Sequence, residues 1–268
     1  MVEDEGRGGA RKGRPASSSR CDGSAAGSCT SSSRSPGRGE HGDLPAAALN
    51  EAGDVVRELA AAGFQVTEAQ LVIFARYLHR VREWGRRVNL VASGDLGRLG
   101  RRHLLESFNI LCHLPPDLAG EGPLADAGSG AGFPGLPLAL LLPHLEVVLI
   151  ESVRKKAQFL DRVVAELELG GRVRVEADRA EVLAVRPEFR GRFAVVTVRG
   201  IGPLSRAVRW CAPLLRPLGH LMVFKGTAAA EEELRLAMTA IGAYGLEFSD
   251  IVPLRWGDGR LVILWRKA

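Results

Sequence analysis

The sequence predicts an α/β protein, with a doubly wound and mostly parallel β-sheet that ends in an antiparallel hairpin and is preceded by a small helical lobe. After residue 123, short apolar runs alternate with helical segments, which is typical of a parallel sheet covered by helices on both faces. Residues 45–115 show the apolar periodicity of amphipathic helices. The turn at 257–259 joins the last two apolar runs closely enough for a hairpin.

Composition divides the chain into three parts and excludes several classes of protein. Residues 1–43 contain no aromatic residue, no Leu and no Ile, so they cannot bury enough apolar surface to offset the entropy of ordering, and we expect a disordered tail. The helical lobe is expected over 44–116 and the α/β domain over 117–268. No apolar run approaches the roughly 20 residues that span a bilayer, which excludes a membrane protein. The four cysteines form no CxxC pair and no zinc-type cluster with histidine, which excludes a disulfide scaffold and a metal site and favours the cytoplasm.

Two helices are predicted in the N-terminal lobe. Thr67 and Gln70 can form a capping box at the start of the first helix. A second helix is expected from about Gly97 to Leu114, because a Pro-Pro pair follows and stops it there. Apolar residues recur at helical spacing along the first helix at Leu71, Phe74, Leu78, Val81 and Val88.

Strands and helices alternate in the rest of the chain. Helices that return the chain to the same edge of the sheet make the early strands parallel, and the last two strands form the hairpin. The strands are expected at 124–127, 147–151, 173–176, 194–198, 218–225, 246–253 and 260–266. The helices are expected near 135–142, 154–168, 179–185, 203–215 and 231–241.

Positive charge is concentrated in the helical lobe. Between Arg76 and Arg102 there are eight arginines and two acidic residues, Glu83 and Asp95, so this window carries a net charge of +6 while the whole chain carries +5. A basic surface of this kind suits a polyanion such as nucleic acid. A solvated helix face would also account for these charges, so the pattern alone leaves both interpretations open.

A glycine-rich loop directly after the first predicted strand carries the chemistry. It runs from Asp126 to Gly135, and its alternating glycines allow positive φ and let a ligand approach the backbone closely. Open α/β sheets bind ligands at the carboxyl ends of their strands, where this loop opens a helix. We therefore expect a cofactor at this loop.

Two cofactors fit the loop. Gly130, Gly132 and Gly135 satisfy the GxGxxG pattern, and Glu151 ends the next strand, as in a dinucleotide site whose acid bonds a ribose hydroxyl. Asp126 favours another cofactor, because a carboxylate at the mouth of the first strand repels a pyrophosphate and attracts a cation. S-adenosylmethionine carries an ammonium, a sulfonium and a ribose, so it is the favoured cofactor, with a nicotinamide dinucleotide as the alternative.

The same loop resembles that of a known family. A doubly wound sheet ending in a hairpin is the shape of the class I methyltransferases. The run Asp126-Ala-Gly-Ser-Gly-Ala-Gly-Phe-Pro-Gly-Leu-Pro resembles the central motif of the glucose-inhibited division protein B family, the bacterial 16S ribosomal RNA guanine-N7 methyltransferases. Further similar motifs lie at 84–90, 103–107, 151–160, 179–181, 198–199 and 225–226. Departures from the family pattern lie in the helical lobe and near the predicted RNA-facing rim, at Gly85, Val91, Glu106 and Gly200.

The resemblance implies S-adenosylmethionine as the cofactor and assigns residues to it. Gly128 and Phe133 would line its pocket, the backbone of Ala180 and Glu181 would hold the adenine, and Arg199 would face the cofactor. Arg199 ends a buried apolar strand, so it requires an anion, which is the cofactor carboxylate, a phosphate or a neighbouring acidic residue. With the loop residues, the predicted cofactor set is Asp126, Gly128, Gly130, Phe133, Glu151, Ala180, Glu181 and Arg199.

Methyl transfer to guanine N7, which the resemblance implies, requires no general base. N7 has a lone pair and no proton, so it attacks the sulfonium methyl group directly, and catalysis rests on alignment and electrostatics. The exit of the fourth strand lacks the D/N-P-P-Y-type motif of exocyclic-amine methyltransferases, which fits a ring-nitrogen target. His103, Arg199 and Lys225 are the candidates if a side chain does take part.

The implied partner is 16S ribosomal RNA or the small-subunit particle in the cytoplasm, with no membrane and no obligate protein partner. Two alternatives are kept: a nicotinamide-dependent oxidoreductase that uses the GxGxxG loop, and a catalytically silent RNA-binding relative. Basic residues at the rim position RNA by contacting phosphates rather than reading bases. The candidate phosphate contacts are Arg76, Arg80, Arg86, Arg87, Arg101, Arg102, Lys155, Lys156 and Lys225.

Overall fold

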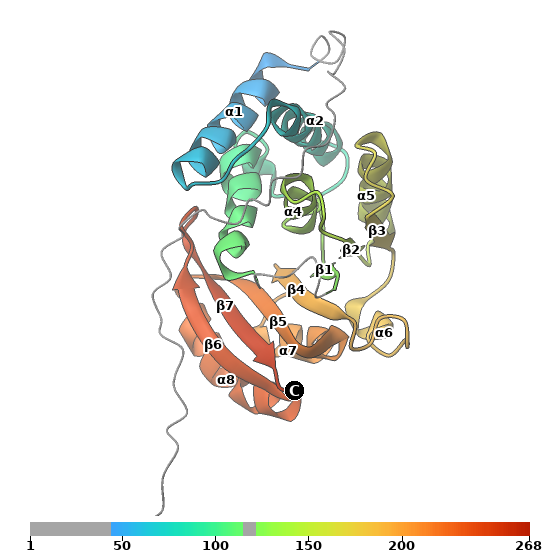
Figure 1. Ribbon diagram of the computed structural model, residues 1–268, viewed down its shortest axis with the longest axis vertical. Helices are drawn as coiled ribbons and strands as arrows, with labels where there is room; N and C mark the ends of the chain where they lie inside the picture. The colour runs from blue at the N-terminus through green and yellow to red at the C-terminus, as the bar shows by residue number, and fades with distance from the viewer. Residues whose placement is uncertain (1–43, 115–121) are drawn as a thin grey trace, which may run out of the picture.

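The computed structural model describes residues 44–114 and 122–268, and the strands of this part form one mixed sheet (Figure 1). The strands are Leu124–Ala127 (β1), Val147–Ile150 (β2), Val173–Glu176 (β3), Phe193–Arg199 (β4), Leu215–Gly226 (β5), Leu246–Pro253 (β6) and Gly259–Arg266 (β7). Their order in the sheet is β3-β2-β1-β4-β5-β7-β6. Strands β1 to β5 are parallel, and β7 is antiparallel to both β5 and β6.

This sheet confirms the predicted fold class. Strands β1, β3 and β6 begin and end where the sequence predicts, and the other four lie within three residues of their expected bounds. All four residues of β1 and of β2 are buried, because helices cover both faces of the parallel part of the sheet. The predicted hairpin is formed by β6 and β7.

Successive side chains of β1 point to opposite faces of the sheet. Leu124 packs in the core of one face, while Ala125 and Ala127 pack in the core of the other. The carboxylate of Asp126 therefore lies on the same face as Leu124. That first face is covered by α4 (Gly135–Leu141) and α5 (Arg154–Glu166), and the second by α6 (Ala180–Leu183), α7 (Leu204–Cys211) and α8 (Ala230–Ala243).

The N-terminal helices α1 (Ala46–Ala61) and α2 (Glu68–Gly85) pack over the first face, and their apolar residues share one continuous core with it (Figure 1). The predicted capping box is present at the start of α2. The Thr67 N–H donates to Gln70 Oε1 at 2.9 Å, and the Gln70 N–H donates to Thr67 Oγ1 at 3.2 Å. Gln70 Nε2 also donates to the Leu141 carbonyl at 3.0 Å, which ties α2 to the end of α4.

The expectation of one regular helix over 97–114 is wrong. Side chains bind backbone groups within this segment. The Gly100 N–H donates to Glu51 Oε1 on α1 at 2.7 Å, and Ser107 Oγ donates to the His103 carbonyl at 2.6 Å. The chain forms 3-10 turns at Ser93–Asp95 (η1) and Phe108–His113 (η3) and a π-helical segment at Gly100–Leu105 (η2). Such π-helical segments occur often at functional sites.

The predicted tail, residues 1–43, lies outside the described residues. Within 44–114 and 122–268, no helix is long and apolar enough to cross a bilayer.

Candidate cofactor and RNA site

The glycine loop leaves the carboxyl end of β1 and enters α4 at Gly135. Gly128, Gly130 and Gly132 have φ values of +74°, +58° and +102°, which other residues rarely adopt. A Cβ at Gly132 would stand 2.5 Å from Leu136 Cδ1, and one at Gly128 would stand 3.0 Å from an atom of Ile201. Gly130 is half-buried, and a Cβ there would make only ordinary contacts, with the Leu90 carbonyl oxygen at 3.8 Å and the Gly128 carbonyl oxygen at 3.9 Å. The loop therefore presents an accessible backbone at Gly130.

Glu151 and Asp126 hold this loop from two sides. Glu151 follows β2, and its carboxylate accepts the N–H of Gly130 at 2.8 Å and that of Val153 at 2.7 Å. Asp126 accepts the Gly135 N–H at 3.1 Å and the hydroxyl of Thr197, on β4, at 2.9 Å. Its side chain is fully buried, and this burial raises the pKa of Asp126 to about 6.

Asp126 lies beneath the loop and not at the open end of β1. A ligand cation would therefore not contact it directly. The alternation of β1 sends its side chain into the first core, where it is bound by the Gly135 amide and the Thr197 hydroxyl. Asp126 therefore fixes the shape of the loop, and Glu151 is the acidic group beside Gly130.

An aromatic cluster joins the helical lobe to the loop. Phe133 is 5% exposed, and its ring stacks on the imidazole of His103, with ring centroids 5.2 Å apart. The ring of Tyr77, on α2, has its centroid 5.3 Å from that of Phe133, and the Tyr77 hydroxyl donates to the Ala131 carbonyl at 2.8 Å. This role of Tyr77 was not predicted, because an apolar position on a helix gives no sign of which backbone carbonyl its hydroxyl will reach.

His103 is neutral at physiological pH. Its Nε2 lies 3.2 Å from Asp95 Oδ2. Burial, with the positive charge of Arg199, lowers the pKa of His103 to about 4, although Asp95 acts in the opposite direction. A histidine with this pKa is a weak base at pH 7. Its ring also stacks on Phe133, so a structural role is favoured over general-base catalysis.

Arg199 ends β4 and binds groups of the helical lobe. Its Nη2 donates to the carboxylate of Glu106 and, at 3.2 Å, to the carbonyl of Arg102. Its guanidinium lies 5.9 Å from the ring centroid of Phe224. Among the three anions that the sequence allows for Arg199, a neighbouring acid is present. Its buried Nη1 has no hydrogen-bond partner within the described residues, so one donor remains for a ligand.

The remaining cofactor residues lie at the start of α6. Ala180 is buried and Glu181 is half-buried, and the Glu181 carboxylate is 3.7 Å from the guanidinium of Arg179.

Lys225 is differently placed from the other basic candidates. Its side chain is 9% exposed, and its ammonium lies 2.5 Å from the carboxylate of Glu233. That ion pair occupies the charge that was expected to meet a phosphate.

The other basic candidates differ in exposure. Exposed side chains are available to RNA, whereas Arg80 pairs with Glu83 and Glu166 at 2.8 Å each. Lys156 and Arg76 are half-buried. The exposed candidates are Arg86, Arg87, Arg101, Arg102 and Lys155.

The strand order, with an antiparallel strand inserted between β5 and β6, and the glycine loop at the end of β1 define a class I methyltransferase fold. Residues 70–252 match the family model described as rRNA small subunit methyltransferase G. The chain belongs to this family, as its motifs indicated, and it is a methyltransferase. The nicotinamide-dependent oxidoreductase is set aside as an alternative.

Individual relatives agree with the family model. The chain is 41% identical over 194 residues to the ribosomal RNA small subunit methyltransferase G of Roseiflexus sp. (strain RS-1), covering 72% of this chain and 80% of that protein. It is 34% identical to the protein of the same name from Lactobacillus johnsonii, covering 75% and 84%. A solved structure of a Corynebacterium glutamicum protein, 17% identical, has a TM-score of 0.50 and covers 81% of this chain and 98% of that one. This last likeness is one of fold alone.

Proposed function

We propose that the protein transfers a methyl group from S-adenosylmethionine to N7 of a guanine in 16S ribosomal RNA. Family membership supports a ribosomal RNA substrate. The observation that carries the proposal is the positive-φ, half-buried backbone of Gly130, whose N–H is bound by Glu151 at the carboxyl end of the first parallel strands. We expect the enzyme to act in the cytoplasm.

The residues around the loop fit this cofactor. Gly128 and Gly130 allow it to approach the backbone, and Phe133 supplies an apolar wall. The Glu151 oxygens each accept one N–H and keep a second lone pair for a ribose hydroxyl. In this proposal Arg199 Nη1 binds the cofactor carboxylate. The backbone at 180–181 holds the adenine.

The side chains act by orienting and binding rather than by moving a proton. The bound cofactor supplies an electrophilic methyl group on sulfur. Guanine N7 provides the electron pair of the new bond and carries no proton to remove, so alignment of nucleophile and methyl group is the main task of the site. The low pKa of His103 and the ion pair of Lys225 are consistent with a reaction that uses neither group as a base.

RNA would approach over the exposed basic side chains of the lobe and of α5. Phosphate contacts by these groups position the strand without reading its sequence. The substrate is naked 16S ribosomal RNA or the small-subunit particle. Arg86 and Arg87 follow the end of α2, and Arg101 and Arg102 lie on η2.

Transfer of a labelled methyl group tests the proposal. The full chain is incubated with S-adenosylmethionine labelled in the methyl group and with either naked 16S RNA or small subunits from cells lacking this protein. We expect label in one nucleotide, and chain cleavage at that nucleotide after reduction and aniline treatment, which is specific for 7-methylguanine. The absence of transfer to both substrates would contradict the proposal and would favour the catalytically silent RNA-binding relative.

A further inference from the structure

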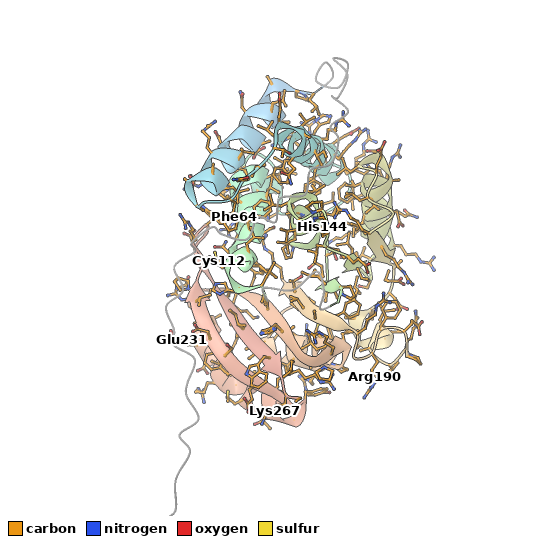
Figure 2. The ribbon with its side chains drawn as sticks, viewed as in Figure 1. Phe64, Cys112, His144, Arg190, Glu231 and Lys267 are labelled. Carbon is orange, nitrogen blue, oxygen red and sulfur yellow. The ribbon has the colours of Figure 1, made fainter. Side chains whose placement is uncertain are left out.

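A cavity of about 350 Å³ lies between η2 and the turn that joins β6 to β7. Its two walls come from segments that are about 150 residues apart in the chain. Figure 2 labels Cys112 on η3, the segment whose Asn109 binds Trp256 of this turn. The turn lies outside residues 70–252, which match the family model. We call this cavity the arginine pocket; its lining includes Arg98, Arg101, Arg102, Arg255, Trp256 and Asp258.

The turn is held firmly against the helical lobe. Asn109 of η3 binds the backbone of Trp256 twice, accepting its N–H at 3.1 Å and donating to its carbonyl at 2.9 Å. Trp256 Nε1 lies 3.4 Å from the carboxylate of Glu58 on α1. Gly257 has a φ of +124°, and a Cβ there would stand 3.1 Å from Glu106 Oε1. The pocket therefore has a fixed wall on the side of the hairpin.

The guanidinium groups of the pocket have uncommitted donors. No hydrogen bond or ion pair involves the Arg101 side chain within the described residues, and Arg255 stacks on Trp256 at 5.4 Å without a carboxylate partner there. Arg102 has only a loose partner, since Asp258 lies 4.0 Å away and its side chain is fully exposed. Arg98 is paired with Asp95 at 3.2 Å.

The other carboxylates of the pocket are already engaged. Glu106 is paired with Arg199, and Glu58 faces the indole N–H of Trp256. The negative charges of Glu106 and Glu58 are thus already balanced by Arg199 and by the indole N–H of Trp256. The donors left over are those of Arg101, Arg102 and Arg255, and such forked groups match the oxygens of a phosphate.

We propose that the arginine pocket binds a phosphodiester group of the RNA substrate, with Arg255 of the hairpin closing it opposite Arg101 and Arg102. The pocket adjoins the proposed reaction centre, because Arg199 donates both to Glu106 and to the Arg102 carbonyl. A phosphate held here therefore belongs to the strand segment near the methylated base. The inference rests on the proposed function, and it adds the hairpin to the RNA-binding surface.

The test measures binding of the full chain to a 16S RNA fragment over a range of salt concentrations. We expect Arg255→Ala to bind RNA roughly three- to tenfold more weakly and to reduce the slope of log affinity against log salt by about 0.7 to 0.9, because the variant has one phosphate-binding charge fewer. Affinity for S-adenosylhomocysteine and the thermal midpoint should stay at the wild-type values. The matched control is Arg209→Ala, which removes an exposed arginine on α7 away from the pocket. It should change neither the RNA affinity nor the salt slope.

A second variant has the opposite sign. Asp258→Asn removes the carboxylate beside Arg102 and should tighten RNA binding about two- to threefold. Wild-type affinity and salt slope in Arg255→Ala would overturn the proposal. So would binding of inorganic phosphate that Arg255→Ala abolishes while RNA affinity is unchanged, since the pocket would then serve a free anion. Failure of the proposed function is distinguishable, because wild-type protein would then bind RNA with the predicted Arg255 effect but transfer no methyl group.

Discussion

Arg199 and Glu106 form an ion pair that joins the end of the central strand β4 to the helical lobe. Their side chains are 20% and 9% exposed, and they come from segments 93 residues apart. The pair fixes Arg199 with its Nη1 unbonded within the described residues, so the same contact that stabilises the two parts also orients the donor assigned to the cofactor.

Glu106→Gln should destabilise the protein and weaken cofactor binding. A buried guanidinium without its charged partner is costly, so the free energy of unfolding should fall by about 2 to 4 kcal/mol in urea titrations. Glu232→Gln removes an acid from an exposed ion pair with Arg235 and should leave unfolding close to wild type. Equal, small effects of both substitutions would show that the Arg199 pair does not hold the lobe.

Gly130→Val should abolish binding of S-adenosylhomocysteine while the protein remains folded. The substitution forces a β-branched residue to a φ of +58°, and its side chain would extend from a Cβ whose nearest protein atom is 3.8 Å away into the proposed cofactor space. Gly245→Val is the matched control for strain, because Gly245 has a φ of +67° and a Cβ there would have no protein atom within 4 Å. Calorimetric titration should show no binding of S-adenosylhomocysteine to Gly130→Val and wild-type affinity in Gly245→Val. Retained affinity in Gly130→Val would remove the cofactor from this loop.

The stability of the protein should depend on His103 at acid pH. The folded-state pKa of His103 is about 4, below its ordinary value of 6.5, so its neutral form is favoured in the folded protein. The contribution of neutral His103 to the free energy of unfolding is complete above pH 6.5. It is lost as the pH falls from 6.5 to about 4, which lowers the free energy of unfolding by about 3 kcal/mol. His103→Phe keeps a ring against Phe133 but cannot be protonated. Between pH 7 and pH 4 the free energy of unfolding of the wild type should fall by about 3 kcal/mol relative to that of His103→Phe, and parallel curves would contradict the assigned pKa.

The exposed arginines should carry the salt dependence of RNA binding. Replacing Arg86, Arg87, Arg101 and Arg102 with Ala should reduce the slope of log affinity against log salt by roughly 0.7 to 0.9 for each arginine that binds a phosphate. Cofactor affinity should barely change, because none of the four lies on the glycine loop. Arg190→Ala with Arg209→Ala serves as the control for reduced surface charge. If the quadruple variant kept the wild-type slope, this surface would be solvated rather than RNA-binding.

The parts of this structure that the sequence predicts are those set by local pattern. Short apolar runs place the seven strands, and the capping box at Thr67 and Gln70 places the start of α2. The alternating glycines likewise predict the loop and its positive φ values. Each of these depends on residues within a few positions of one another, where periodicity and φ preference decide the conformation.

Contacts between distant segments could not be predicted in this way. The regular helix expected over 97–114 is replaced by π-helical and 3-10 segments, and the Gly100 N–H at the start is bound by the carboxylate of Glu51 from another helix. The pairing of Asn109 with Trp256 joins residues 147 positions apart. Asp126 was expected at the mouth of the first strand, yet its side chain is fully buried and binds the Gly135 N–H from within the core. In each case, tertiary packing determines the partner of a polar group, and the local sequence does not predict that partner.

Mass mapping of 16S ribosomal RNA from cells tests the central claim most directly. RNA is compared among cells that lack this protein, cells that express the wild type and cells that express Gly130→Val. The account predicts one 7-methylguanine that is present with the wild-type protein and missing in the other two. A 16S RNA with the same methylated nucleotides in all three cells would contradict it.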